Sequence, residues 1–565
     1  MNKRDITEAE RADALAHRFL RGDLSRRDFL RRAGAFSAAA LAASSLGAVV
    51  AACGSSASPV PGSTAPGSVP ATSVGPASAA PAPSAVAKSG GTLKAALTGE
   101  PDSLDPAKSA IYTATQVFSH VYNTLVAVDE TNKFYPVLAT KWEQPDPKTW
   151  TFDLVDNATF HNGEKFSAED VKYTFDRLLD PATAATSAAL FASIESVEVV
   201  SPTKVTFHLK YPFAPFFINA INEGWIVNKK AIEAGDSARN PVGTGPFTFV
   251  EWIQGDHLTL KKNDKYFQSG LPYLDGIEFK FLLVDQSRIE ALRSGDLDWA
   301  DALPLQQLAT LSKDPAFTYV TSPTAGIPDF LSFNCAKAPF DKAAFREAVA
   351  WAVDRKQIRD IAYFGAGEVG SEEVASGSTW FTPNDVYASA PDLDKAKAKL
   401  AEAGIVTPFT IKYLGLPQYP ELLKTGEVVR DNLKAIGITM EIEQVEVSVW
   451  FDRYVKGNYE ITSAYHEGTI DPDYFWSLVI RSGASLNASA YKNSDLDKMI
   501  DAARTEQDPT KRKELYMGIR QAAAETVPVH FVHYETLNYL MRKDVVGSTV
   551  NETLEPRLQF VWLDR

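Results

Sequence analysis

The chain has 565 residues, a formal net charge of −14 and 45% hydrophobic residues. That length exceeds what one hydrophobic core usually serves, so we expect two or three folded units. The acidic balance opposes binding to nucleic acid or to an anionic lipid surface, because both would repel the protein at long range. Partners should therefore be neutral or cationic, or should bind at a local surface patch.

The first 52 residues have the pattern of an export signal. Arg26 and Arg27 lie in a basic segment, and an apolar run rich in alanine, serine and glycine follows from Ala33 to Ala52. A positive segment before a short apolar one is typical of signal peptides. The arginine pair resembles the twin-arginine export motif, which implies export of the folded protein.

The apolar run ends at Val50-Ala-Ala-Cys53-Gly-Ser, which resembles the lipobox of bacterial lipoproteins. Residues 1–52 are then the signal peptide, and Cys53 carries the lipid. An uncleaved transmembrane helix is the alternative, but alanine, serine and glycine gain little from burial in hydrocarbon. We expect the mature protein at the extracytoplasmic face of the cell membrane or in the periplasm, attached to the membrane through its lipid alone.

Residues 53–90 consist largely of proline, alanine, serine and glycine, which is typical of a flexible tether. Cys335 is the second cysteine of the chain. Because lipid on Cys53 would leave it no partner for an internal disulfide, we interpret Cys335 as a small buried apolar residue.

From Gly91 onward, apolar periodicity and turn residues indicate a folded body. Ser167 is followed three residues later by Asp170, and Val171, Phe175 and Leu178 recur at helical spacing. The serine is a suitable N-cap and the apolar stripe is suitable for packing, so this segment predicts a helix on the body.

Residues 408–445 predict a strand, a helix and a second strand. The strands are 408–415 and 438–445, the helix covers 421–436, and Gly437 is placed to end it. A crossover unit of this kind normally has parallel strands. We therefore expect one α/β lobe, with ligand-facing loops at the ends of its strands.

Several blocks of the sequence, in order, resemble the family 5 extracellular solute-binding proteins, which include oligopeptide-, dipeptide- and nickel-binding receptors of ABC importers. The blocks are Leu125–Asp170, Pro241–Trp252, Phe333–Arg355 and Tyr491–Asp497. The similarity runs from about Gly91 to the C-terminus.

The resemblance implies a two-lobed α/β fold of the periplasmic-binding-protein type, in its large form with three subdomains and a ligand cleft at a hinge. Lobe I would comprise residues 91–124, 240–325 and 535–565, and residues 125–239 would form a subdomain inserted into it. Lobe II would comprise residues 326–534, so that the chain crosses the hinge twice.

No catalytic motif or metal-ligand spacing is evident among the candidate residues. His530 and His533 are three apart in a predicted strand and should point to opposite faces, which disfavours a shared metal. Gly243-Thr-Gly245 lacks the spacing and the lysine of a phosphate loop and predicts a tight turn. We expect no enzyme activity, no cofactor and no bound metal.

Aromatic and acidic residues gather in the second half of the chain in a mixture that suits a cleft for an amphipathic solute. For each single aromatic residue, ordinary core packing is the alternative. We predict Trp380, Tyr465 and Trp476 as apolar walls and Glu467 and Asp473 as partners for a cation. The remaining candidates for ligand binding are Tyr112, Trp450, His466 and Asp471.

The resemblance implies that, in peptide-binding members of the family, an acidic residue shortly before the step that corresponds to Asp471-Pro472 pairs with the free amine of the ligand. Gly468 occupies that position here, and Glu467 is its neighbour. Either Glu467 takes the role through a shifted loop, or the ligand has no peptide amine.

The resemblance predicts a monomeric binding protein that captures a solute, with peptide as the default class, by hinge closure and delivers it to an ABC permease. A lipoprotein that senses its ligand and signals to a membrane receptor is the main alternative. A metal-chelate or haem carrier and an exported enzyme are further alternatives, disfavoured by the scattered histidines and the missing catalytic motifs.

Overall fold

The structure is a computed structural model, and it describes residues 87–301, 303–384, 386–466, 470–551, 553 and 555–565. The predicted export motif at Arg26 and Arg27, the lipid site at Cys53 and the predicted cation partner Glu467 lie outside these residues. In the part of the chain that is described, no helix combines the length and the apolar character needed to cross a membrane.

An eleven-stranded mixed sheet runs through the molecule. Ten of its strands follow one another in space, and the eleventh, β13 (Glu368–Val369), pairs with β17. In spatial order the ten are β15 (Ile438–Gln444), β14 (Phe409–Gly415), β16 (Ile461–Tyr465), β12 (Phe317–Phe333), β17 (Val529–Arg542), β11 (Trp299–Asp301), β1 (Thr92–Leu97), β10 (Gly276–Phe281), β9 (His257–Lys262) and β8 (Phe247–Ile253).

A separate four-stranded antiparallel sheet lies in the predicted insertion, and two strand pairs complete the β structure. The four strands, in spatial order, are β4 (Ala139–Asp146), β5 (Thr149–Leu154), β7 (Lys204–Leu209) and β6 (Ile194–Ser201). The pairs are β2 (Val126–Val128) with β3 (Phe134–Pro136), and β18 (Val545–Val546) with β19 (Trp562–Leu563).

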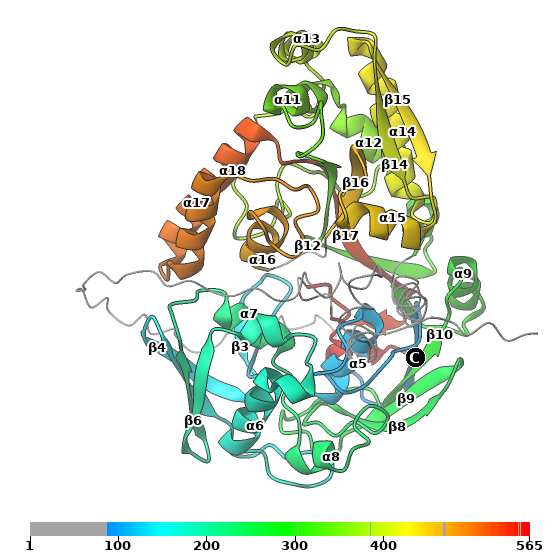
Figure 1. Cartoon of the computed structure of the whole chain (residues 1–565). Helices are drawn as coiled ribbons and strands as arrows, with labels where there is room; N and C mark the ends of the chain where they lie inside the picture. The colour runs from blue at the N-terminus through cyan, green and yellow to red at the C-terminus, as the bar shows by residue number, and fades with distance from the viewer. Residues whose placement is uncertain (1–86, 302, 385, 467–469, 552, 554) are drawn as a thin grey trace, which may run out of the picture.

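Helices lie at both ends of the main sheet and beside the four-stranded sheet (Figure 1). On the lobe I side they are α5 (Tyr112–Val121), α6 (Ala168–Leu179), α7 (Phe216–Glu223), α8 (Lys229–Glu233), α9 (Asp285–Ser294) and α10 (Leu305–Leu311). On the lobe II side they are α11 (Ala343–Ala352), α12 (Arg355–Ala362), α13 (Leu393–Glu402), α14 (Pro420–Leu433), α15 (Val447–Val455), α16 (Asp473–Phe475), α17 (Ser494–Thr505) and α18 (Pro509–Thr526). Short 3₁₀ turns cover Pro181–Thr183, Ala188–Phe191, Lys434–Ile436 and Leu558–Phe560, and Trp476–Ile480 forms a π-helical turn.

The antiparallel strands β12 and β17 connect the two ends of the molecule. At one end β17 also pairs with β11, through Trp299 and Met541. At the other end β12 pairs with β16, through Phe333 and Ile461. The register of β12 against β17 shifts between Thr321 and Gly326, midway along the pair.

Figure 1 shows the part predicted as lobe II above, and the parts predicted as lobe I and its insertion below. The buried apolar residues form separate cores in these parts. One core gathers around β1, β10 and α5, another lies between the four-stranded sheet and α6, and two lie in lobe II. Each part therefore has its own apolar interior, as separate domains have.

The predicted helix after Ser167 is confirmed. Helix α6 begins at Ala168, the Ser167 N–H donates to Asp170 Oδ2 at 2.9 Å, and the serine and Asp170 form a capping box. Val171, Phe175 and Leu178 are buried, with at most 4% of each exposed. The apolar stripe and the cap therefore both act as the sequence indicated.

The predicted crossover unit is also confirmed, because β14 and β15 pair in parallel and α14 lies between them in the chain. Gly437 has a φ of 79° and follows the 3₁₀ turn that extends the helix. This left-handed conformation favours glycine and lets the chain turn directly into β15.

The glycines of Gly243-Thr-Gly245 lie against the end of α5. A Cβ added at Gly243 would lie 2.0 Å from the carbonyl oxygen of Val121, and one at Gly245 would lie 2.4 Å from that of His120. Close backbone approach therefore explains both glycines, without a phosphate.

We expect Ser167→Ala to lower the free energy of unfolding by about 1 kcal/mol, because the variant loses its part of the capping box. Urea unfolding followed by circular dichroism measures this change. Ser376, which is exposed in a loop, provides the control substitution Ser376→Ala. Equal effects of the two substitutions would contradict the role of the cap.

Candidate functional site

A cavity of about 220 Å³ lies between the two lobes. Lobe I and its insertion supply one wall, and the segment from residue 470 to 478 with α17 supplies the other. The lining residues are Ala110, Tyr112, Thr115, Ala189, Leu190, Phe213, Pro215, Ile218, Asn219, Asn222, Glu223, Ile470, Asp471, Asp473, Tyr474, Ser477, Leu478, Arg504, Thr553 and Glu555.

The insertion contacts lobe II directly beside this cavity. The backbone N–H of Ala214 donates to the Arg504 carbonyl oxygen at 2.9 Å, and the Arg504 guanidinium lies 5.3 Å from the centre of the Phe213 ring. The Gln144 side-chain amide donates to Gln507 Oε1 at 2.8 Å. These contacts join the lobes at a distance from the β12–β17 connection.

Asp471 is held by an arginine of its own lobe. Arg512 Nη1 and Nη2 donate to its two carboxylate oxygens at 2.5 and 2.7 Å, and both side chains are buried. A planar guanidinium matches a carboxylate in this two-point geometry. Asp471 is therefore ion-paired, and it shapes the lobe II wall instead of presenting an uncompensated charge.

Asp473 is the first residue of α16 and is 5% exposed. Arg504 Nε lies 3.1 Å from its Oδ1, and Ser477 donates to its Oδ2 at 3.3 Å. Burial raises the pKa of Asp473 to about 6, although the charge of Arg504 acts in the opposite direction. Asp473 was predicted to bind a cation of the ligand. The Arg504 guanidinium would compete with that cation for the Asp473 carboxylate.

On the lobe I wall, Tyr112, Glu223 and Glu555 come from α5, α7 and the C-terminal segment. Burial, and next to it the negative charge of Asp301, raise the pKa of the Tyr112 hydroxyl well above its ordinary value. Burial also raises the pKa of Glu555, and the nearby charge of Glu223 raises it further. Glu555 and Tyr112 on this wall therefore keep their protons to a higher pH than exposed groups of the same kind.

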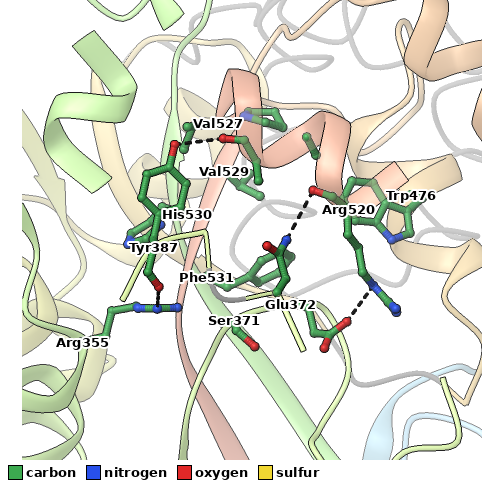
Figure 2. Close-up of a pocket in the computed structure, with 14 residues that line it drawn as sticks. Arg355, Ser371, Glu372, Tyr387, Trp476, Arg520, Val527, Val529, His530 and Phe531 are labelled. Carbon is green, nitrogen blue, oxygen red and sulfur yellow. Dashed lines mark hydrogen bonds and ion pairs between the residues drawn. The ribbon is translucent and has the colours of Figure 1, made fainter. Parts of the chain in front are cut away.

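A second, smaller pocket of about 40 Å³ lies within lobe II (Figure 2). Trp476 lines it and is 1% exposed, and the indole Nε1 has no hydrogen-bond partner. The Arg520 guanidinium forms ion pairs with Glu372 at 2.8 Å and with Glu373 at 2.6 Å beside it. The predicted wall residue Trp476 thus faces this pocket and does not line the cavity between the lobes.

Trp380 and Trp450 pack within lobe II. The Trp380 ring meets Tyr516 edge-on at 5.9 Å, and the Arg512 guanidinium lies 5.0 Å from its centre. Trp450 stacks on Tyr454 at 4.7 Å, and its Nε1 donates to Thr462 at 3.0 Å. The structure places neither residue among those that line the two pockets described above.

Tyr465 and His466 lie at the end of β16, beside residues 467–469, which are not described. Tyr465 is 38% exposed, and its ring lies 5.9 Å from that of Tyr419. His466 stacks on Phe330 at 5.9 Å, and burial lowers its pKa to about 4. Tyr465 is therefore partly open to solvent, whereas His466 is half-buried.

Of the nine candidates for ligand binding, the structure brings Tyr112, Asp471 and Asp473 together at the cavity between the lobes. Sequence reasoning missed Phe213, Asn222, Glu223, Arg504 and Glu555. The run Tyr211-Pro-Phe-Ala-Pro-Phe-Phe217 carried an aromatic signal. The other four residues belong to no local motif, and their proximity arises only from the fold.

The expectation that His530 and His533 would face opposite sides of a regular strand was wrong. Both lie in β17, but a bulge sets His530 opposite Leu331 and His533 opposite Asp329, two residues apart on β12. The His533 ring stacks 3.6 Å from that of Tyr363, and burial lowers its pKa to about 3. In the part of the chain that the structure describes, no three His, Cys, Asp or Glu residues are arranged to hold a metal ion.

Three carboxyl groups gather where β12 and β17 pass α14. Asp329 is 2% exposed, and its Oδ2 has no hydrogen-bond partner. Burial, followed by the charges of Glu535 and Glu421, raises the pKa of Asp329 well above its ordinary value. Burial and the charge of Glu421 raise the pKa of Glu535 to about 7.

A two-lobed α/β fold, in which two strands of one sheet join the lobes beside a cavity, defines a binding protein of the periplasmic type. The model of the bacterial extracellular solute-binding proteins, family 5, matches residues 133–487. The chain therefore belongs to this family.

Relatives with known names agree with this assignment. The probable D,D-dipeptide-binding periplasmic protein DdpA of Escherichia coli K12 is 29% identical over 437 residues, which cover 74% of this chain and 82% of that protein. The structure of AgaA in complex with agropinic acid, from A. tumefaciens R10, is 28% identical, covers 84% of this chain and 99% of AgaA, and has a TM-score of 0.70.

The binding protein DppA of Helicobacter pylori, in complex with the peptide STSA, is 25% identical. It covers 85% of this chain and 99% of its own, with a TM-score of 0.71. The predicted family and fold class are confirmed by these matches.

The pKa of Glu535 leads to a pH-dependence of stability. A carboxyl group with a pKa near 7 in the folded protein, compared with ~4.3 in the unfolded chain, binds its proton more tightly when folded. Its contribution to stability is therefore complete below about pH 4 and is lost as the pH rises through 7.

We expect Glu535→Gln to raise the melting temperature relative to the wild type at pH 8 but not at pH 4. Thermal unfolding across this range measures the difference. Glu441, which is exposed on β15, provides the control Glu441→Gln. A melting difference independent of pH would show that Glu535 does not titrate in this way.

Proposed function

We propose that this protein is a lipid-anchored, extracytoplasmic substrate-binding protein that captures a solute by hinge closure and delivers it to an ABC transporter. The single observation that carries the proposal is the cavity of about 220 Å³ whose lining is shared by lobe I, its insertion and lobe II. A solute there contacts both lobes at once, so it favours the conformation in which they approach each other.

The hinge in this proposal is the pair β12 and β17. These strands carry the chain from lobe I (91–124, 240–325 and 535–565) to lobe II (326–534), and their register shifts near the crossing. A change of backbone twist at the shift would rotate one lobe against the other while the pairing of each half persists.

Peptide is the proposed class of solute. DdpA is named for a D,D-dipeptide and the Helicobacter pylori protein holds a peptide, whereas AgaA holds agropinic acid. The cavity has aromatic rings and carboxylates in its lining, such as Phe213, Tyr112 and Asp473, which suits an amphipathic organic molecule. The protein acts by binding alone in this proposal, as a monomer and without a cofactor.

Solute capture can be tested with the folded domain purified from its host. Native mass spectrometry identifies co-purified solutes, and a thermal-shift screen of peptides, sugars and cationic metabolites finds others. We expect a true solute to raise the melting temperature and to reduce the radius of gyration in solution scattering. If no solute changes either quantity, the receptor function is wrong.

Anchoring through Cys53 gives a separate prediction. We expect Cys53→Ser to release the protein from the membrane fraction, because the thioether-linked lipid supplies the only attachment that we propose. Fractionation and immunoblotting measure the distribution. The matched control is Cys335→Ser, since Cys335 lies in the folded body, and it should remain with the membrane. Membrane association of the Cys53→Ser variant would contradict a lipid anchor.

A further inference from the structure

The predicted insertion and the predicted lobe II touch at a place separate from the strand pair β12–β17. On the side of the insertion are Gln144 on β4 and Phe213 and Ala214 in the loop before α7. On the side of lobe II are Arg504 near the end of α17 and Gln507 in the turn before α18. These five residues are called the clasp below.

Three contacts join the two halves of the clasp. The Ala214 N–H donates to the Arg504 carbonyl oxygen at 2.9 Å, and the Gln144 side-chain amide donates to Gln507 Oε1 at 2.8 Å. The Arg504 guanidinium lies 5.3 Å from the centre of the Phe213 ring, within the range of a cation–π interaction. All three contacts are between groups of the protein, so their contribution to holding the lobes together is the same for any solute.

The clasp lies away from the strands that connect the lobes. Figure 1 shows α17 and β4 at one side of the molecule, whereas β17 runs between the lobes nearer the opposite side. A rotation of the lobes about the β12–β17 pair displaces distant groups more than groups close to the axis. Hydrogen bonds of ordinary length at this distance break in such a rotation. The clasp is therefore formed only when the lobes are close together.

The clasp also contributes to the wall of the cavity between the lobes. Phe213 and Arg504 both line this cavity, as does Pro215, the neighbour of Ala214. The Arg504 Nε atom lies 3.1 Å from Oδ1 of Asp473, which belongs to the same lining. Separation of the clasp would therefore open the cavity along this part of its wall.

We propose that the clasp sets the equilibrium between the open and closed forms of the receptor, so that its strength governs how tightly a solute is held and how readily it is released. Arg504 is a positioning residue in this proposal, because its carbonyl oxygen and its guanidinium both contact the insertion while the guanidinium also lies beside Asp473. The proposal rests on the proposed function and describes how that same site opens.

The equilibrium between the two forms enters the affinity for every solute. A solute that contacts both lobes binds the closed form better, so its apparent dissociation constant rises as the closed form becomes less populated. The loss of one hydrogen bond changes an equilibrium of this kind by about two- to tenfold. Because the clasp contains no solute group, weakening it should change the affinities for different solutes by the same factor.

Hydrogen exchange measures the clasp in the protein without added solute. The Ala214 amide exchanges with solvent when its hydrogen bond to Arg504 opens, so its protection reports the balance of closed and open forms. The Leu209 amide donates to the Lys148 carbonyl oxygen at 2.7 Å within the insertion. It provides an internal reference, because opening of the lobes leaves this hydrogen bond in place.

Two double variants change the clasp in opposite directions. The first, Gln144→Glu with Gln507→Glu, places two carboxylates against each other, so the protection of the Ala214 amide should fall by about two- to tenfold while that of Leu209 stays unchanged. The second, Gln144→Lys with Gln507→Glu, replaces the hydrogen bond by an ion pair and should restore the protection. Gln521, which is exposed on α18, provides the control Gln521→Glu, which should exchange like the wild type.

The same variants test the effect on solute binding. The probes are two neutral dipeptides of different size, Ala-Phe and Ala-Ser, and isothermal titration calorimetry measures their affinities. Both affinities should fall by one common factor in the first double variant and recover in the second. If neither dipeptide binds, the proposed class of solute is wrong, and the exchange of the Ala214 amide still decides whether the clasp acts as proposed.

Several results would overturn the clasp and leave solute capture intact. Unchanged protection of the Ala214 amide in the first double variant is one, and failure of the second to restore that protection is another. A loss of protection at Leu209 as large as that at Ala214 would show that the insertion unfolds by itself instead of separating from lobe II. Unequal factors for the two dipeptides would show that the substitutions act on the solute and not on closure.

Discussion

The pairing of β12 with β17 is the constraint on which the rest of the structure depends. The chain passes along β12 towards β16 and returns along the antiparallel β17 towards β11, so the residues between these strands are joined covalently to the rest of the chain through this pair. A Cβ added at Gly326 would lie 2.0 Å from the Glu535 carbonyl oxygen, and the Tyr534 hydroxyl donates to the Gly326 carbonyl at 3.2 Å. The backbones thus approach closely beside the register shift, where a side chain on residue 326 would separate them.

The local elements could be predicted from the sequence because the residues that determine them lie close together in the chain. The capping box at Ser167 and the left-handed turn at Gly437 each depend on a few neighbouring residues, and apolar spacing then sets the buried face. The bulge in β17 could not be predicted in this way, because an extra residue in one strand can be recognised only when its pairing with the partner strand is known. Strict alternation therefore placed His533 incorrectly relative to His530.

The candidate site was harder to predict for the same physical reason. Trp450 and Trp380 are aromatic residues of the kind that line binding sites. Both instead pack in or against a hydrophobic core of lobe II, and the indole N–H of Trp450 donates to Thr462. Glu223 and Glu555 are separated by more than three hundred residues and carry no motif. Only the fold places them in the lining of one cavity, so their proximity has no signal in the sequence.

The carboxylates of Asp471 and Asp473 in the cavity lining are offset within their own part of the chain. Asp471 pairs with Arg512, and Asp473 lies 3.1 Å from Arg504. Arg504 also links the two sides of the cavity, because its carbonyl oxygen accepts from Ala214 and its guanidinium lies 5.3 Å from the centre of the Phe213 ring in the insertion. The backbone hydrogen bond from Ala214 does not involve the Arg504 side chain, so this contact with the insertion does not depend on the ion pair with Asp473.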